Sequence, residues 1–186
     1  MLYAQVHLTL PAWVHDAVDT ARVYAGDEDK MALAIELARR NVEAGSGGPF
    51  GAAVFGPEHR LIAAGVNRVV SQHASLAHAE IMACMLAQQR LQSARLNTLL
   101  HPITLATASQ PCCQCFGATI WAGIDRLLIG ARGEDVTELA GFDEGPLPAD
   151  WIGELERRGI EVVRDLQREQ SRAVLRAYAE AGGQRY

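Results

Sequence analysis

The chain has 186 residues, of which 49% are hydrophobic and 21% are charged, and its formal net charge is -5 at pH 7. This composition excludes a disordered chain, and the length suits one globular domain, 1–186, with a sizeable core. The negative balance, repeated locally in the acid-rich stretch from Glu134 to Glu156, argues against a nucleic-acid partner, because phosphate-binding surfaces are usually basic.

The sequence also lacks the signals of membrane insertion and export. No apolar run approaches the roughly 18 residues of a membrane-spanning helix, and no basic flank followed by an apolar stretch opens the chain. We therefore expect a cytoplasmic protein without membrane contact. The cysteines are Cys84, Cys112, Cys113 and Cys115. Most of them crowd into one short segment, which favours metal binding or catalysis over a disulfide framework.

Apolar periodicity and turn residues divide the first part of the chain into short elements. In order, they predict a strand or surface arm over 1–10, a helix over 11–23, a helix over 29–44, a hairpin of strands 51–56 and 61–66, and a polar loop over 67–75. The helix over 29–44 is the clearest of these, because its apolar residues recur at helical spacing and Gly45 follows its last turn.

Beyond this loop, helices and strands alternate. The pattern predicts a helix over 77–92, a strand over 103–108, a helix over 112–122, a strand over 126–130, a loop over 133–148 with one helical turn near 136–140, a helix over 151–158, a strand over 160–164 and a helix over 168–181. Such alternation after a leading hairpin predicts an α/β domain built around a mixed sheet.

Two stretches carry most of the chemistry, His78-Ala79-Glu80 and Pro111-Cys112-Cys113-Gln114-Cys115. Cys112 and Cys115 share one face of the predicted helix, and a helix N-terminus favours the thiolate that binds zinc. With His78 they offer three ligands and leave the fourth tetrahedral position to water, which is the pattern of catalytic zinc sites. Glu80 is then the expected proton carrier.

Two other classes of protein fit part of this pattern. A thiol redox protein would use Cys112 and Cys115, but that interpretation leaves His78 and Glu80 without a role. A structural zinc site closed by Cys113 would make the chain a binding module. Cys113 lies off the face shared by the other two cysteines and is expected to be a spare thiol, and Cys84 is expected to be a small core residue.

Several stretches resemble the cytidine-deaminase-fold purine and pyrimidine base deaminases, and the likeness spans nearly the whole chain. They are Gly48–Val54, Asn67, His78–Glu80, Cys115–Ala118 with Trp121, and Gly141–Glu144. The last stretch, G-F-D-E, resembles the bacterial guanine deaminase branch, including a subgroup that acts on both guanine and the triazine ammeline. The resemblance implies a three-layer α/β/α sandwich with a mixed five-stranded sheet.

The resemblance also implies the reaction and the residues that perform it. The reaction is hydrolytic deamination of guanine at C2 to xanthine and ammonia, with ammeline as a further substrate; the alternative is a deaminase of cytosine, cytidine or adenosine in transfer RNA. The implied residues are His78, Cys112 and Cys115 for one Zn²⁺ per chain, Glu80 and Glu144 for catalysis, and Asn67, Phe50, Trp121, Ala79 and Asp143 for binding of the base.

Without the resemblance, Asp143 and Glu144 would be interpreted as solvated turn residues, because acidic residues between Gly and Pro are common in turns. The resemblance further implies a homodimer in which the segment 145–186 crosses to the partner subunit, so that Glu144 could act in trans. Gln110 and Gln114 depart from the family pattern, which often has Glu and Met there. Neither is a ligand, so the zinc prediction is unaffected, although the electrostatic surroundings of the metal differ.

Overall fold

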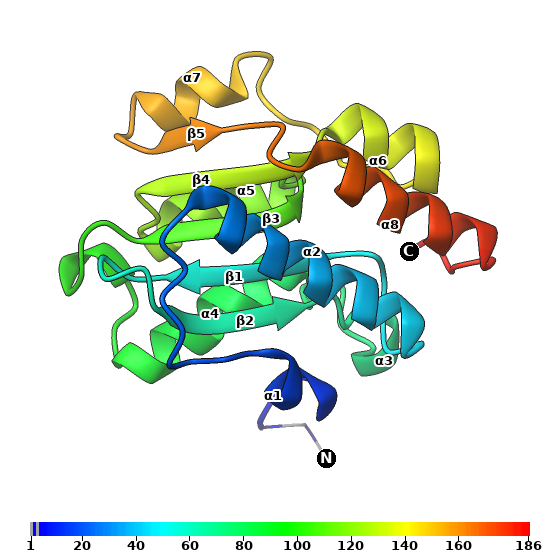
Figure 1. Cartoon of the computed structure of the whole chain (residues 1–186), viewed down its shortest axis with the longest axis horizontal. Helices are drawn as coiled ribbons and strands as arrows, with labels where there is room; N and C mark the ends of the chain where they lie inside the picture. The colour runs from blue at the N-terminus through cyan, green and yellow to red at the C-terminus, as the bar shows by residue number, and fades with distance from the viewer. Residues whose placement is uncertain (1, 3) are drawn as a thin grey trace.

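One mixed sheet organises the computed structural model, which describes residues 2 and 4–186 (Figure 1). The sheet has five strands in the order β2-β1-β3-β4-β5. Its strands are β1 Gly51–Phe55, β2 Leu61–Val66, β3 Thr104–Ser109, β4 Arg126–Ala131 and β5 Glu161–Val163. β1 runs antiparallel to β2 and β3, whereas β3, β4 and β5 are parallel. The predicted α/β fold with a mixed five-stranded sheet is confirmed.

Helices cover both faces of the sheet, which explains why its strands are almost continuously apolar. α2 Asp27–Glu43 and α8 Arg168–Glu180 lie on one face, and α4 Ala79–Leu91, α5 Cys113–Ala122 and α7 Trp151–Glu156 lie on the other (Figure 1). Successive residues of a strand point to opposite faces. Ala53 and Phe55 of β1 therefore pack on the α2 side, while Ala52 and Val54 join the core on the α4 side.

The topology brings four chain segments together where the strands end, on one side of the sheet. Parallel β3 and β4 end there, and each is followed by a helix, α5 or α6 Gly133–Ala140. Because β1 is antiparallel to β3, its first residue, Gly51, lies at the end where β3 and β4 finish. Gly51 pairs there with Val66, the last residue of β2. The carboxyl ends of parallel strands are where α/β sheets bind ligands. Phe50, Asn67 and the segment 110–115 are thus brought together.

The N-terminal predictions hold only in part. Residues 4–10 form no strand; Thr9 instead exchanges hydrogen bonds with Gln72 and accepts one from Arg68. The helix predicted over 11–23 is the short α1 Trp13–Ala17. It ends early because the Asp19 carboxylate accepts the amides of Ala21 and Arg22 in a turn, which competes with helical hydrogen bonding.

Two helices form where loops were predicted. α3 Val69–Gln72 occupies the loop predicted over 67–75, and its first amide, Val69, donates to the side chain of Asn67. α6 is a full helix rather than the single turn predicted near 136–140, because the Asp135 carboxylate caps its start by accepting the Arg132 amide. A short 3₁₀ turn, η1 Leu96–Thr98, precedes β3.

The C-terminal segment packs on its own chain. β5 pairs with β4, and α8 contributes Val174 to the core on the α2 side. This chain therefore completes its own sheet, and exchange of the segment 145–186 with a partner stays a prediction. Among the described residues, every helix is too short or too polar to cross a membrane.

Candidate metal centre and substrate cavity

His78, Cys112 and Cys115 converge as the sequence predicts. His78 Nδ1 lies 3.5 Å from Cys112 Sγ and 3.6 Å from Cys115 Sγ, and the three ligand atoms all lie within 4.8 Å of one another. A tetrahedral Zn²⁺, with Zn–N near 2.0 Å and Zn–S near 2.3 Å, keeps such atoms roughly 3.5 Å apart. The donor set therefore fits one zinc ion.

Two helix N-termini present these ligands. His78 immediately precedes α4, and its carbonyl accepts the Met82 amide; Cys112 immediately precedes α5, and its carbonyl accepts the Phe116 amide. Cys115 lies in the first turn of α5 and is fully buried. Because helices are rigid and both pack on the sheet, the ligands are held in place by the fold itself.

The electrostatics of the three ligands centre on the Cys112 thiolate. Hydrogen bonds from Cys115 and His78 lower the pKa of Cys112 to about 4, despite its partial burial, so this sulfur is a thiolate at neutral pH. Burial lowers the pKa of His78, but its bond to Cys112 and the nearby Glu80 carboxylate outweigh this, and the net shift is upward. The hydrogen bond with Cys112, together with burial, raises the pKa of Cys115. The cluster is therefore a Cys112 thiolate that holds the protons of its two neighbours, and a divalent cation would displace those protons on binding.

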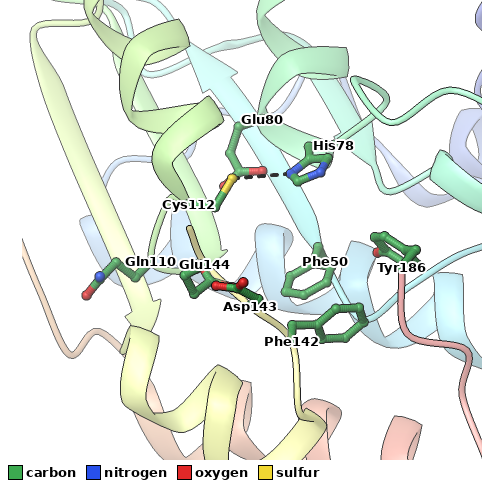
Figure 2. A pocket seen from close by; sticks show the side chains of 9 residues that line it. All are labelled: Phe50, His78, Glu80, Gln110, Cys112, Phe142, Asp143, Glu144 and Tyr186. Carbon is green, nitrogen blue, oxygen red and sulfur yellow. Dashed lines mark hydrogen bonds between the residues drawn. The ribbon is translucent and has the colours of Figure 1, made fainter. Parts of the chain in front are cut away.

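A cavity of about 50 Å³ opens beside this cluster (Figure 2). His78, Glu80 and Cys112 lie on one side, and the aromatic residues lie on the opposite side. The residues that line it are Phe50, His78, Glu80, Gln110, Cys112, Phe142, Asp143, Glu144 and Tyr186.

Two carboxyl groups, Glu80 and Glu144, face the cavity from different elements. Glu80 is in the first turn of α4 and only 6% exposed, and burial raises its pKa. Burial, reinforced by the negative Cys112, raises the pKa of Glu144 to about 8. Both carboxyls therefore hold a proton more readily than an exposed glutamate, as groups that transfer protons near neutral pH must.

The loop after α6 brings Glu144 to the metal centre. Its backbone carbonyl accepts the Cys113 amide at the start of α5, at 2.9 Å. Asp143 also lines the cavity, and its carboxylate accepts the Gly145 amide at 2.9 Å to close the turn. Glu144 thus reaches the cavity of its own chain, so the site does not require this residue in trans.

Aromatic rings form the wall opposite the metal ligands. Phe142 lies at the centre, with ring centroids 5.1 Å from Phe50, 6.0 Å from Tyr178 and 5.0 Å from Tyr186. Edge and offset contacts at such distances stabilise the cluster beyond the burial of its area. The prediction for Phe50 fits this position, since a planar base binds well against an aromatic wall.

Asn67 is buried next to Gly48, is not among the residues that line the cavity, and forms only part of its possible hydrogen bonds. It is 1% exposed, and its Oδ1 accepts the Val69 amide at 3.2 Å, but its Nδ2 has no hydrogen-bond partner. A Cβ atom added to Gly48 would lie 3.4 Å from Asn67 Oδ1 and would overlap the Tyr186 hydroxyl, so both side chains meet at Gly48. An unpaired buried amide is costly and suggests a polar ligand as its partner.

Two predicted binding residues lie elsewhere. Trp121, near the end of α5, is 77% exposed and does not line the cavity. Trp121 lies on a different side of α5 from Cys115, so its indole points to the outer surface. Ala79 is fully buried against β2, where its carbonyl touches Gly65. Neither side chain lines the cavity of this chain, and a role for Trp121 or Ala79 in binding the base stays a prediction.

Three lining residues had no role assigned from sequence, namely Gln110, Phe142 and Tyr186. Gln110 could have been found, because it precedes the Pro-Cys motif, and Phe142 belongs to the G-F-D-E stretch. Tyr186 had no local signal, since only the tertiary fold brings it to Gly48. Cys113 is exposed and outside the ligand cluster, and Cys84 is buried, both as expected.

Comparison with solved structures gives close neighbours over almost the whole chain. A guanine deaminase from Nitrosomonas europaea is 44% identical, with a TM-score of 0.90, and the alignment covers 97% of this chain and 99% of that chain. The crystal structure of a variant of NE0047 in complex with 8-azaguanine has a TM-score of 0.89 at 44% identity, covering 95% of this chain and 98% of that chain.

Sequence relatives agree on the family and differ in their activities. Guanine deaminase of Bacillus subtilis is 37% identical over 117 residues, which are 63% of this chain and 71% of that protein. A transfer-RNA-specific adenosine deaminase of Buchnera aphidicola is 34% identical over 128 residues, covering 68% and 77%. The model of the cytidine and deoxycytidylate deaminase zinc-binding region matches residues 25–131, which include all three metal ligands. The chain therefore belongs to this family of zinc-dependent deaminases.

Proposed function

We propose that this protein deaminates guanine, with water, to xanthine and ammonia. The observation that carries the proposal is the pairing of two carboxyl groups, the buried Glu80 and the partly buried Glu144, on one cavity with the zinc ligands. Hydrolysis of an amino group from a ring requires proton transfer both to the ring and to the departing amine. The structural neighbour that binds the guanine analogue 8-azaguanine supports a purine as the substrate.

In this proposal Glu80 moves the protons of the reaction. Zn²⁺, when bound by His78, Cys112 and Cys115, supplies the electrophilic chemistry that makes water a nucleophile near neutral pH. Glu80 accepts one proton from the attacking water and delivers it to the ring nitrogen. It then takes the second proton, from the hydroxyl that has been added to the carbon, and delivers it to the amine, which leaves as ammonia while the carbonyl forms. Its raised pKa suits this exchange, because a strongly acidic carboxylate would not hold the proton between steps.

Glu144 and Asn67 recognise the base. Guanine presents N–H donors on one edge, and a carboxyl group beside the metal ligands can accept them. The free Nδ2 of Asn67 supplies a donor for a ring nitrogen or carbonyl oxygen. Phe50 offers an aromatic face to the ring, and Asp143 supports the turn that carries Glu144. Ammeline, which is also a ring with an amino group and carbonyl oxygens, is proposed as a further substrate.

We also propose a homodimer and no nucleic-acid partner. The exposed Trp121 on the outer face of α5 is an apolar surface that a second copy would bury. The acidic net charge opposes binding of transfer RNA, although some relatives act on it. A mobility-shift assay with transfer RNA tests this second point, and a retarded band at physiological salt would reverse it.

The first experiment measures ammonia release by purified protein of known zinc content. The panel contains guanine, ammeline, cytosine, adenine, cytidine and guanosine. We expect release from guanine at one zinc per chain. Release from another member alone would keep the zinc chemistry and refute guanine as the substrate. A protein without zinc that has a titratable dithiol and no deaminase activity would indicate the thiol redox alternative.

A further inference from the structure

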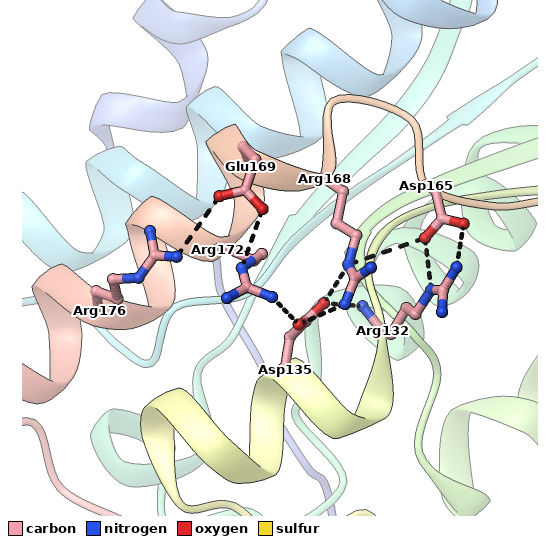
Figure 3. A network of polar contacts seen from close by, with 7 residues as sticks. All are labelled: Arg132, Asp135, Asp165, Arg168, Glu169, Arg172 and Arg176. Carbon is pink, nitrogen blue, oxygen red and sulfur yellow. Dashed lines mark hydrogen bonds and ion pairs between the residues drawn. The ribbon is translucent and has the colours of Figure 1, made fainter.

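One buried carboxylate anchors the helix that leads into the cavity loop. Asp135, in the first turn of α6, is 1% exposed. Figure 3 shows it between the arginines of α8. Its carboxylate accepts Arg168 Nε at 2.7 Å, Arg168 Nη2 at 2.8 Å and Arg172 Nη1 at 2.6 Å, besides the Arg132 amide at 2.9 Å. Both oxygens are thus used in directional, charge-assisted bonds.

α6 connects this anchor to the cavity. The helix has eight residues and is about 12 Å long. Its apolar side packs Val136 and Ala140 against the α8 residues Leu175 and Tyr178. The chain then leaves through Gly141, which has φ +72° and closes the helix, and Phe142 and Glu144 follow. A rotation of α6 about its axis would therefore displace the loop at its end.

The Glu144 side chain depends on this backbone for its position. Among the described residues, no side chain or amide forms a hydrogen bond with its carboxyl oxygens, and its own carbonyl is held only by the Cys113 amide. The neighbouring contacts of the loop are the aromatic packing of Phe142 and the turn closed by Asp143. The carboxyl group is therefore placed by the path of the loop, which α6 sets at one end and α5 at the other.

We propose that Asp135 is a positioning residue for Glu144: by fixing α6 to α8 through Arg168 and Arg172, it sets the place of the Glu144 carboxyl in the cavity. This inference rests on the proposed function, in which Glu144 contacts the base. Buried ion pairs are often no more stabilising than apolar residues of similar volume, because desolvation offsets their attraction. Their bonds do, however, fix orientation, and orientation is what the end of a short helix requires.

The test replaces the anchor while preserving its shape. Asp135→Asn keeps the size of the side chain and removes its charge and one acceptor. We expect kcat per zinc-loaded site to fall by about 10- to 100-fold, the usual result of a misplacement near 1 Å. The matched control is Glu161→Gln, because Glu161 in β5 forms a similar two-bond pair with Arg126, at 2.7 and 3.2 Å, and contacts neither Asp135 nor its arginine partners. This control should change kcat by less than about threefold.

A double-mutant cycle separates positioning from stability. If Asp135 acts through Glu144, Asp135→Asn should have little further effect on kcat in a Glu144→Gln background, because the group that it places is already lost. Independent effects that multiply would overturn the proposal. A loss of kcat that simply follows the loss of folded, zinc-loaded protein would overturn it as well.

Two further measurements keep the test decisive. If Asp135→Asn does not fold, Arg168→Lys removes the two-bond fork and should give the same pattern in the cycle. Amide hydrogen exchange gives a readout besides activity: residues 141–145 should exchange faster in Asp135→Asn and not in Glu161→Gln, and equal exchange would contradict the proposal. The kinetics use whichever base of the panel the wild type deaminates, so an error in the substrate is distinguished from an error about Asp135.

Discussion

The burial of Glu80 determines what its substitution should do. Glu80→Gln keeps the shape of the side chain and leaves His78, Cys112 and Cys115 untouched, so zinc content should stay near one per chain. The amide cannot exchange protons, and kcat should fall by about 10²- to 10⁴-fold. Zinc quantification together with ammonia release checks both expectations. Near-normal turnover by the variant would show that another group carries the proton.

Two buried asparagines allow a matched comparison. Asn41 is satisfied within the protein, since its Nδ2 donates to the carbonyls of Gly48 and Asn67, both at 2.9 Å. Asn67 has a free Nδ2. Asn67→Ala should therefore lower kcat/KM for the base by about 10- to 100-fold, because a hydrogen bond to substrate is lost. Asn41→Ala should instead lower the midpoint of urea unfolding by destabilising the loop.

Steady-state kinetics and urea titration of both variants test this assignment. The reverse pattern, with Asn41→Ala the more damaging to kcat/KM in folded protein, would mean that Asn67 serves the fold alone.

Residues in a local motif were predictable, and those placed by the tertiary fold were not. The zinc ligands and Glu80 lie in short segments whose spacing at helix starts already implies convergence. Tyr186 joins the cavity only through the return of α8 and the tail after it, which no local pattern encodes. Trp121 lies outside the cavity of this chain because proximity in sequence to Cys115 does not fix which side of α5 a residue occupies.

At the scale of elements, close approach of helix and strand sets the position of His78. Gly65 of β2 lies against α4, and a Cβ atom there would overlap the Ala79 carbonyl and lie 2.5 Å from the Ala83 amide. Gly65→Ala should push the start of α4 away from the sheet, lowering both zinc affinity and stability, by about 1–3 kcal/mol for the latter.

Gly117 provides the control, because a Cβ atom at this position in α5 meets no atom within 4 Å. Gly117→Ala should be neutral or stabilise by up to about 1 kcal/mol, since alanine favours a helix. Thermal unfolding and competition with a zinc chelator measure the two effects. Equal zinc affinity in both variants would refute the link between the β2 contact and His78.

The ion pairs of Asp135, which hold α6 to α8, should also make the stability of the protein depend on pH. Hydrogen bonds from Arg168, above all, hold the pKa of Asp135 at about 2, below its ordinary value of 3.8. A depressed carboxyl pKa stabilises the fold above the unfolded-state pKa, and this stability is lost as pH falls through the folded-state pKa. The difference in unfolding free energy between wild type and Asp135→Asn should thus be about 2 kcal/mol near pH 7.

That difference should shrink as pH falls from about 4 towards 2, which urea titrations across this range would measure. A difference that stays constant down to pH 2 would mean that the Asp135 charge does not stabilise the native state.

Most elements followed from periodicity, and the errors at α3 and α6 share one cause. α3 and α6 were predicted as loops because their segments are polar or acid-rich, while their helices depend on side chains that cap them, Asn67 for α3 and Asp135 for α6. Such a cap is visible in a sequence only once the helix start is known. The five strands were clearer, because burial on both faces leaves them almost wholly apolar.

At the scale of the whole molecule, the exposed indole of Trp121 predicts that a charged side chain at this position dissociates the proposed dimer. Trp121→Glu would place a carboxylate in the interface, where an unpaired buried charge costs several kcal/mol, and should give monomers at micromolar concentration. Leu99→Glu changes another exposed apolar side chain, outside α5, and should leave the dimer intact. Sedimentation velocity distinguishes the two. A wild type that is already monomeric would refute the proposed dimer.

The position of Tyr186 has a practical consequence for any laboratory that expresses this protein. Its ring lines the cavity and touches Phe142, and its hydroxyl meets Gly48. Residues joined after Tyr186 would start beside the cavity. An affinity tag fused there would crowd the cavity, whereas a tag at the other end of the chain would precede residues 4–10, none of which lines it. Preparations that differ only in the end that carries the tag should therefore not be assumed to have the same KM.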